Sequence, residues 1–271
     1  MAKPDIEAEV RGKRIFRIGA PFNLALAGLR SKGIESPMTS EELAYARTNH
    51  PEGRQSSLMA SGSYTLAGFA YMKGENPIRM ASSPLLNRSL AKQATKENKA
   101  GRYFATKDEM AYGRIARMAE EDKSRKPEER RAIVLPSRSK FQISSTQNSE
   151  VFANIFGKAG KKYLEFLGFD SLTLYLVDSS VVDAQNGTIL TQEWLAGLDL
   201  GSAVGGNLRS LLYNGAVRGV QLVTGEASSQ KTDKVILPYT PQDLKKAKKE
   251  LGRLSQIFVN LSGLVSKLRR N

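Results

Sequence analysis

A run of apolar residues at 172–177 is the feature that most limits how this chain can fold. It is rich in branched and aromatic side chains, which are typical of a buried strand. The preceding range, 148–167, has the apolar spacing of a helix that two glycines interrupt. Strands are also expected at 131–135 and 141–144, on either side of Pro136. This order of strand, helix and strand predicts an α/β or α+β body.

The N-terminal half adds elements of both kinds. A strand is expected at 10–18, and the helix that follows at 21–32 should end at Gly33. Ser40 is a suitable first residue for another helix, because the next two positions are acidic and suit the positive end of a helix. Further strands are predicted at 57–72 and 76–81, and further helices at 87–99 and 106–126.

The last thirty or so residues combine an apolar side with many Lys and Arg. From Thr240 onward, apolar residues recur at spacings of three and four, as on one side of a long helix. Gly252 and Gly263 weaken a coiled-coil interpretation, so packing on the chain's own body and self-association both remain open. The expected fold class is therefore α+β, a mixed α/β body with a long C-terminal helix.

A stretch of mixed charge at 120–131, broken by Pro127, is the best candidate for a domain edge. The predicted regions are a basic N-terminal α+β region at 1–126, an α/β region with a neutral to acidic body at 127–239, and the long basic amphipathic helix at 240–271. A single domain over 1–239 is the alternative.

Composition excludes several classes of chemistry. The 271 residues include no Cys, which removes disulfides, thiolate nucleophiles and iron–sulfur clusters. The single histidine, His50, lies in a polar turn and is interpreted as a solvated residue. No cofactor is expected. No apolar stretch reaches the length that spans a bilayer, and the first residues are too acidic for a signal peptide, so a cytoplasmic protein is expected.

Two short segments are similar to the motifs of RNA-recognition-motif domains. The tetrapeptide at 68–71, Gly-Phe-Ala-Tyr, resembles the core of RNP1, and 15–19 resembles RNP2. This resemblance would place Phe16, Phe69 and Tyr71 on a base-stacking face. Packing of these aromatic side chains in the core is the preferred interpretation.

Three acidic residues near the buried strand could build a metal site. Asp178 follows the strand directly, and Asp183 and Glu193 come later in the chain. Carboxylates at the end of a strand can hold Mg²⁺ against a phosphate, as in nucleases. Turn formation by the two aspartates is the preferred interpretation. The glycine-rich range 201–219 is likewise interpreted as hairpin or irregular loop, because it matches no phosphate-binding motif.

The sign of the charge points to a partner. With 41 Lys and Arg against 27 Asp and Glu, the net charge of +14 predicts a polyanionic ligand. The main hypothesis is a non-catalytic nucleic-acid-binding protein, a nucleoprotein or a subunit of a ribonucleoprotein assembly, that contacts RNA or DNA through phosphates. The candidate binding residues are Arg14, Arg17, Lys92, Lys96, Lys99, Arg102, Arg138, Lys140, Lys245, Lys246, Lys248 and Lys249.

Two alternatives remain open. One is a metal-dependent nuclease that uses Asp178, Asp183 and Glu193. The other is a structural protein of a virus, phage or other particle, whose basic surface faces a packaged genome or an acidic neighbour.

Overall fold

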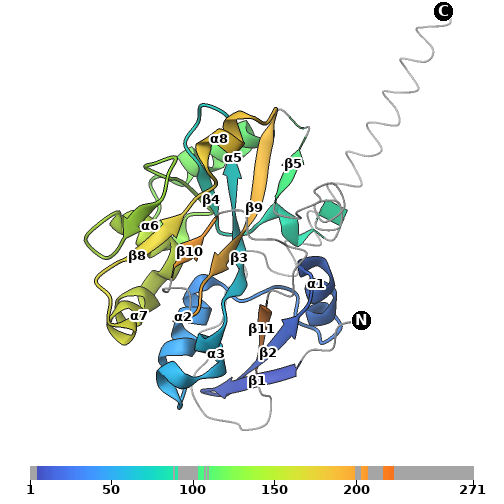
Figure 1. Cartoon of the computed structure of the whole chain (residues 1–271), viewed down its shortest axis with the longest axis vertical. Coiled ribbons are helices and arrows are strands. Elements are labelled where there is room, and N and C mark those ends of the chain that lie inside the picture. The colour runs from blue at the N-terminus through green and yellow to red at the C-terminus, as the bar shows by residue number, and fades with distance from the viewer. Residues whose placement is uncertain are drawn as a thin grey trace, which may run out of the picture. The chain divides into compact units, whose positions relative to one another are not determined.

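The computed structural model describes residues 5–87, 89–90, 103–106, 108, 110–198, 203–206 and 216–222 (Figure 1). The chain divides into two compact units, 1–224 and 225–271, and every element below belongs to the first unit. The predicted C-terminal helix lies outside the described residues, and so does most of the helix predicted at 87–99.

The first unit is built on one mixed sheet of eleven strands among the described residues, so an α+β class is confirmed. The strand bounds are Asp5–Val10 (β1), Lys13–Gly19 (β2), Ser63–Tyr71 (β3), Ile78–Met80 (β4), Phe104–Thr106 (β5), Ala132–Val134 (β6), Phe141–Ile143 (β7), Leu172–Tyr175 (β8), Thr188–Leu195 (β9), Val204–Gly205 (β10) and Ala216–Leu222 (β11). The main path runs β1-β2-β11-β3-β9-β10-β8-β7, with β4 and β5 paired to β3 and β9.

Most neighbouring strands are antiparallel, and the exceptions join distant parts of the chain. Strand β11 lies between β2 and β3 and runs parallel to β3, while β10 runs parallel to β8. Strands β4 and β6 come from opposite sides of the domain edge predicted at 120–131, and they pair with each other. Residues on both sides of that edge therefore share one sheet.

Short helices lie on both sides of the sheet (Figure 1). Among the described residues, none is long and apolar enough to cross a membrane. The α-helices are Phe22–Arg30 (α1), Ser40–Thr48 (α2), Ser57–Ala60 (α3), Ala111–Glu121 (α5), Ser149–Phe156 (α6), Gly160–Leu167 (α7) and Ser179–Asp183 (α8), and the 3-10 turns are Gly53–Gln55 (η1), Pro84–Leu86 (η2), Pro127–Glu129 (η3) and Gly157–Ala159 (η4).

The sheet separates two apolar clusters. One contains residues of α2, α6 and α7, and the other contains residues of α1 and α5. Successive side chains of a strand point to opposite faces, so Phe69 and Tyr71 belong to the first cluster and Ala70 to the second. Phe16 is also buried. The core interpretation of these aromatic side chains is confirmed.

The strand predicted at 10–18 is instead a hairpin of β1 and β2. Its two-residue turn consists of Arg11 and Gly12, with φ angles of 46° and 73°. Positive φ at both central positions defines a turn whose twist matches that of the flanking strands. Arginine is unusual at a turn position with positive φ, so the residue types at 11–12 do not clearly mark a turn. The alternation at 10–18 is therefore typical of one continuous strand.

Three other boundaries also differ from prediction. Residues 57–60 form α3, so the strand predicted from 57 begins only at Ser63. The helix predicted from 106 begins at Ala111, because 104–106 pairs with β9. Helix α2 does begin at Ser40, but Thr39 is the residue whose side chain caps it.

Candidate functional site

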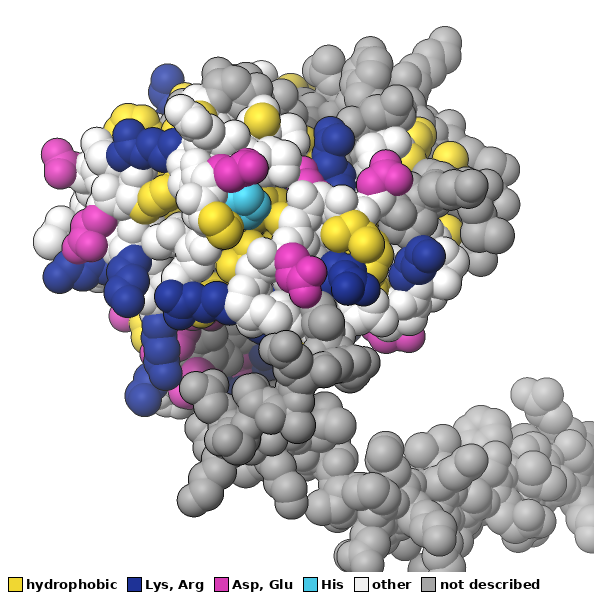
Figure 2. Space-filling model, turned by 90° about the horizontal axis from the view of Figure 1, so that it is seen from below, with side chains coloured by type: hydrophobic (Ala, Val, Ile, Leu, Met, Phe, Trp, Pro, Cys, Tyr) yellow, Lys and Arg dark blue, Asp and Glu magenta, His cyan; other side chains and the backbone are white. Residues whose placement is uncertain are grey.

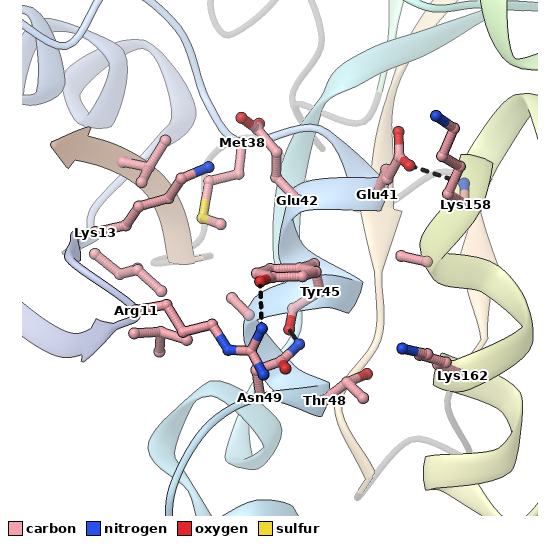
Figure 3. Close-up of a pocket in the computed structure, with 15 residues that line it drawn as sticks. Arg11, Lys13, Met38, Glu41, Glu42, Tyr45, Thr48, Asn49, Lys158 and Lys162 are labelled. Carbon is pink, nitrogen blue, oxygen red and sulfur yellow. Dashed lines mark hydrogen bonds between the residues drawn. The ribbon is translucent and has the colours of Figure 1, made fainter. Parts of the chain in front are cut away.

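A pocket of about 440 Å³ lies over α2, between the β1–β2 hairpin and the start of α7 (Figure 3). Its lining combines an apolar part with a charged and polar part. The apolar residues are Val10, Ile15, Met38, Ala46, Ala159 and Val220, and the others are Arg11, Lys13, Glu41, Glu42, Tyr45, Thr48, Asn49, Lys158 and Lys162. Four segments far apart in the sequence thus line one pocket.

Helix α2 presents one side to the pocket. Glu41, Tyr45 and Thr48 follow one another at spacings of four and three, so their side chains share a face, while Leu43 and Ala44 are buried on the other. The helix start is held by a capping box, in which the Thr39 hydroxyl accepts the Glu42 N–H at 3.0 Å and Glu42 accepts the Thr39 N–H at 2.9 Å. The capping box therefore fixes the N-terminal end of α2, where the helix face that lines the pocket begins.

The hairpin tip is joined to α2 through Tyr45. The Arg11 guanidinium donates a hydrogen bond to the Tyr45 hydroxyl at 3.2 Å, and its central carbon lies 5.8 Å from the ring centre. Arg11 makes these contacts from the left-handed backbone region, which costs free energy for a residue other than glycine. Tyr45 nevertheless stays 40% exposed, so a large part of it remains accessible.

The wall formed by η4 and α7 is held in place by Glu41. One Glu41 carboxylate oxygen accepts the backbone N–H of Lys158 at 2.8 Å. Gly157 has a φ of 48°, and a Cβ at this position would lie 2.4 Å from the same carboxylate oxygen. Only glycine combines this backbone angle with this approach, and the approach positions Lys158 beside the pocket.

The acidic and the basic side chains of the pocket differ in whether they have partners within the described structure. Glu42 takes part in the helix cap and Glu41 accepts the Lys158 N–H, so both carboxylates accept internal hydrogen bonds. In contrast, the ammonium groups of Lys13, Lys158 and Lys162 form no ion pair with any described residue. Four cationic side chains and two carboxylates line the pocket, so its lining has a net positive charge, with cationic groups available to an anion.

Elsewhere on the described surface the charges are mixed. In Figure 2 the Lys and Arg side chains are spread over the face and interspersed with Asp and Glu. Lys and Arg only slightly outnumber Asp and Glu among the described residues, so most of the net charge of +14 belongs to the other segments.

The predicted binding residues do not gather at this pocket. Alternation along β2 places Arg14 on the α1 face, and Arg17 on the opposite face together with Lys13 and Ile15. Arg17 lies 3.8 Å from Glu7. Arg138 pairs with Asp183, and Lys140 is exposed. The other predicted residues lie outside the described residues: Lys92, Lys96, Lys99, Arg102, Lys245, Lys246, Lys248 and Lys249.

The three acidic residues considered for a metal site have separate structural roles. Asp178 caps α8 by accepting the Ser180 N–H at 2.8 Å, and Asp183 pairs with Arg138. Glu193 is fully buried on β9. Within the described part of the chain, no group of three His, Cys, Asp or Glu residues is placed to hold a metal. The metal site considered for the nuclease alternative is therefore not formed.

Glu193 is instead the acceptor of a buried network. Arg79 on β4 donates to its carboxylate at 2.5 and 3.2 Å, Thr65 donates at 2.8 Å, and the Ser40 hydroxyl donates as well. Burial by itself would raise the pKa of Glu193. The positive charge of Arg79 and these hydrogen bonds outweigh burial and lower that pKa. Because Ser40 is the first residue of α2, the network ties the pocket helix to the sheet.

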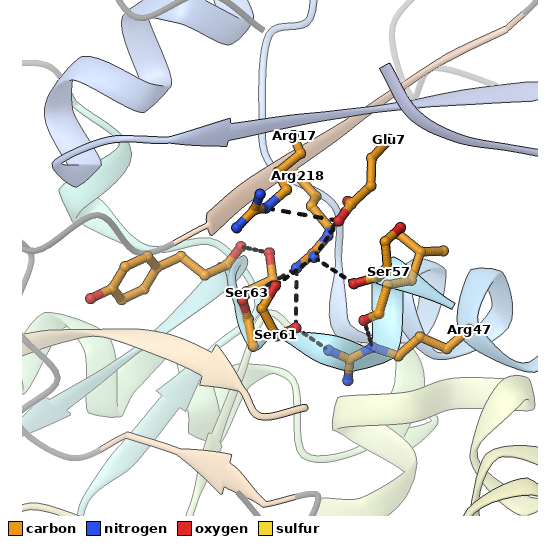
Figure 4. Close-up of polar contacts among 10 residues, drawn as sticks. Glu7, Arg17, Arg47, Ser57, Ser61, Ser63 and Arg218 are labelled. Carbon is orange, nitrogen blue, oxygen red and sulfur yellow. Dashed lines mark hydrogen bonds and ion pairs between the residues drawn. The ribbon is translucent and has the colours of Figure 1, made fainter. Parts of the chain in front are cut away.

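A second buried network links β1, β11 and the segment before β3 (Figure 4). Arg218 on β11 donates to both Glu7 carboxylate oxygens, at 2.5 and 2.7 Å, and also to the Ser61 hydroxyl at 2.9 Å. Arg47 on α2 is buried nearby, and its guanidinium donates to the carbonyl oxygens of Leu58 and Ala196 and to the Tyr163 hydroxyl. These arginines thus serve internal contacts and are not available to a ligand.

Sequence reasoning missed the cationic residues of the pocket: Arg11, Lys13, Lys158 and Lys162. A local signal existed for the hairpin, because an acidic and apolar segment at 5–10 precedes a glycine and a second alternating segment. The cluster Gly-Lys-Ala-Gly-Lys-Lys at 157–162 was visible as well. Nothing in the spacing of these two segments shows that they flank one helix.

Comparison with known proteins bears on the fold. No family model matches this chain, and no curated protein matches it. A solved structure, described as accommodation of massive sequence variation in Nanoarchaeota by the C-type lectin fold, is similar with a TM-score of 0.53 and 14% sequence identity. The match covers 79% of this chain and 100% of that one. At this identity the likeness concerns the fold alone, and it places this chain near the C-type lectin fold.

Proposed function

We propose that this protein is a non-catalytic nucleic-acid-binding protein that contacts phosphates through cationic side chains. The observation that supports this proposal best is the pocket over α2, where Lys13, Lys158 and Lys162 have no ion-pair partner among the described residues while both carboxylates accept internal hydrogen bonds. Phosphate oxygens are the anions that lysine and arginine bind in nucleic acids. The net charge of +14 favours the same class of ligand.

The basic segments outside the described residues would add affinity without reading sequence. The ranges 92–102 and 240–271 carry eight of the predicted binding residues, and the second is proposed to be a long basic helix. Contacts of this kind neutralise phosphates and release counterions. The proposal covers two forms of this function, a nucleoprotein and a subunit of a ribonucleoprotein assembly.

A nuclease at Asp178, Asp183 and Glu193 is not favoured, because Glu193 is buried against Arg79 and the two aspartates have other partners. A particle protein would use the same affinity for polyanions. Light scattering separates that alternative, since a particle protein should assemble with rising concentration in the absence of nucleic acid.

The fold likeness suggests how the pocket can be tested. The similar structure is described as accommodating massive sequence variation. We infer that the present scaffold also tolerates changes on the pocket rim, because the two apolar clusters and the buried networks do not depend on the rim lysines. Rim variants should therefore fold and report on binding.

The first test is the affinity of the full chain for a labelled oligonucleotide of mixed sequence, measured by fluorescence anisotropy at salt concentrations from about 50 to 200 mM. Binding should weaken steeply, with a linear relation between the logarithms of affinity and salt concentration. Absence of binding at the lowest salt concentration, or affinity that ignores salt, would contradict the proposal.

Removal of two pocket lysines should reduce this salt dependence. Lys158→Gln combined with Lys162→Gln removes two cationic groups and retains the backbone N–H that Glu41 accepts. The slope of the logarithmic plot should decrease by about one for each phosphate that the variant no longer neutralises. Lys161→Gln is the matched control, because Lys161 is exposed on the same helix and does not line the pocket. Lys162→Gln alone gives the direct comparison with this control, and equal effects of Lys161→Gln and Lys162→Gln would show that the pocket is not the binding site for phosphate.

A further inference from the structure

We infer that the pocket over α2 receives one unstacked base next to Tyr45, so the protein prefers single-stranded to double-stranded nucleic acid. The inference rests on the proposed function and specifies its ligand. It follows from the exposure of Tyr45, the position of its ring and the arrangement of cationic groups around it.

The Tyr45 ring has two different sides. In Figure 3, Arg11 and Asn49 lie on one side of the ring, and Lys13, Met38 and Glu42 lie on the other. The hydrogen bond from Arg11 to the Tyr45 hydroxyl restrains the ring orientation. A restrained aromatic ring on a residue that is 40% exposed is a suitable stacking partner for a base, and the neighbouring guanidinium plane is another.

Cationic groups lie on both sides of the helix that carries the ring. Arg11 and Lys13 belong to the hairpin, whereas Lys158 and Lys162 belong to the opposite wall (Figure 3). A strand that crosses α2 could therefore place a base at Tyr45 and phosphates toward each wall. Proteins that bind single strands combine these two features, a cationic groove and an aromatic stacking platform.

The walls make a duplex a poor ligand for this pocket. Tyr45 lies on a helix between the hairpin and the start of α7, in a pocket of about 440 Å³. A base in a duplex is paired and stacked, so it must leave the stack before it can reach the ring, and this costs free energy that an unpaired base does not lose. Basic residues outside the pocket can still contact the phosphates of a duplex.

The apolar part of the lining fits a base better than a small inorganic anion. Val10, Ile15 and Met38 are nearly buried and form the apolar floor of the pocket, and Val220 is partly exposed beside them. A phosphate or sulfate ion would gain nothing from this surface, whereas the faces of a base are apolar and its backbone is anionic. This combination selects a nucleotide unit of a chain.

The test compares one labelled oligonucleotide as a single strand and as a duplex, with wild type and three variants of the full chain. The single strand should bind more tightly. Tyr45→Ala should weaken single-strand binding about tenfold, as expected for the loss of one base–aromatic stack, and should leave duplex binding nearly unchanged. Tyr45→Phe keeps the ring and should retain most of the affinity. Tyr175→Ala is the matched control, because Tyr175 is 38% exposed on β8 and does not line the pocket.

The outcomes separate this inference from the proposed function. If single strand and duplex bind equally, and Tyr45→Ala changes neither affinity, the inference is wrong and phosphate binding stands. If neither ligand binds, the proposed function fails. Photocrosslinking of wild type to a single strand that contains 5-iodouracil gives a measurement without any variant: a crosslink at Tyr45 supports the inference, and crosslinks found only elsewhere overturn it.

Discussion

Replacement of Glu193 by glutamine is expected to lower the free energy of unfolding by about 3–5 kcal/mol. The substitution keeps the size of the side chain and removes its charge. Arg79, whose side chain is 3% exposed, would then hold a positive charge in the interior with no carboxylate beside it. The cost comes from this uncompensated charge, which buried surroundings stabilise poorly.

The same substitution should change the dependence of stability on pH. The folded state lowers the pKa of Glu193, so the carboxylate contributes stability above its ordinary pKa of about 4.3, and that contribution is lost as pH falls through the folded value. The variant lacks this contribution at every pH. The difference between wild type and Glu193→Gln should therefore be largest near neutral pH and decrease in acid.

Urea unfolding followed by circular dichroism at several pH values measures both effects. Glu150→Gln is the control, because Glu150 pairs with Arg130 at 2.8 Å but its side chain is 64% exposed, and it should lose less than about 1 kcal/mol. Equal losses for the two variants would show that the Glu193 network does not have the stabilising role described above.

Replacement of Glu7 by glutamine is expected to have an effect of similar size, about 3–5 kcal/mol. Arg218 is fully buried and Glu7 is its carboxylate partner in the described structure. Burial lowers the pKa of Arg218, and the positive charges of Arg47 and Arg17 lower it further, so the loss of Glu7 would leave like charges near one another. Strands β1 and β11, which carry Glu7 and Arg218, would lose the ion pair that links them.

Two further variants test this mechanism in the same unfolding experiment. Glu9→Gln is the matched control, since Glu9 is exposed on the same strand. The double variant Glu7→Gln with Arg218→Met should recover part of the lost stability, because it also removes the unpaired buried charge. A double variant less stable than Glu7→Gln would indicate that the hydrogen bonds of Arg218 to the 57–62 segment matter more than its charge.

These buried networks also matter for the pocket. Ser40 donates to Glu193 at the first residue of α2, and Arg47 near the end of α2 donates to the carbonyl of Ala196. Both ends of the helix that carries Tyr45 are thereby attached to the body of the protein. Variants that loosen either network should weaken ligand binding as well as lower stability.

Local features of the chain were predictable where local chemistry determines them. Apolar periodicity predicted α1 and the segment of α6 and α7, and the branched and aromatic run predicted β8. The hairpin turn at Arg11 and Gly12 was missed because arginine is unusual at a turn position with positive φ, although Gly12 between two alternating segments was a local signal. The buried roles of Glu193 and Arg218 were missed because their partners lie more than one hundred residues away in the chain.

Composition and short-range spacing were sufficient to establish the α+β class, the buried character of Phe16, Phe69 and Tyr71, and the excess of positive charge. Which charged side chains are available to a ligand depends on the three-dimensional arrangement of the chain. That arrangement placed hairpin residues 11–13 and helix residues 158–162 on opposite sides of α2, and it paired Arg79, Arg138 and Arg218 with carboxylates. An ion pair or a pocket depends on distance in space, and spacing along the chain does not determine that distance when sheet pairing brings remote segments together.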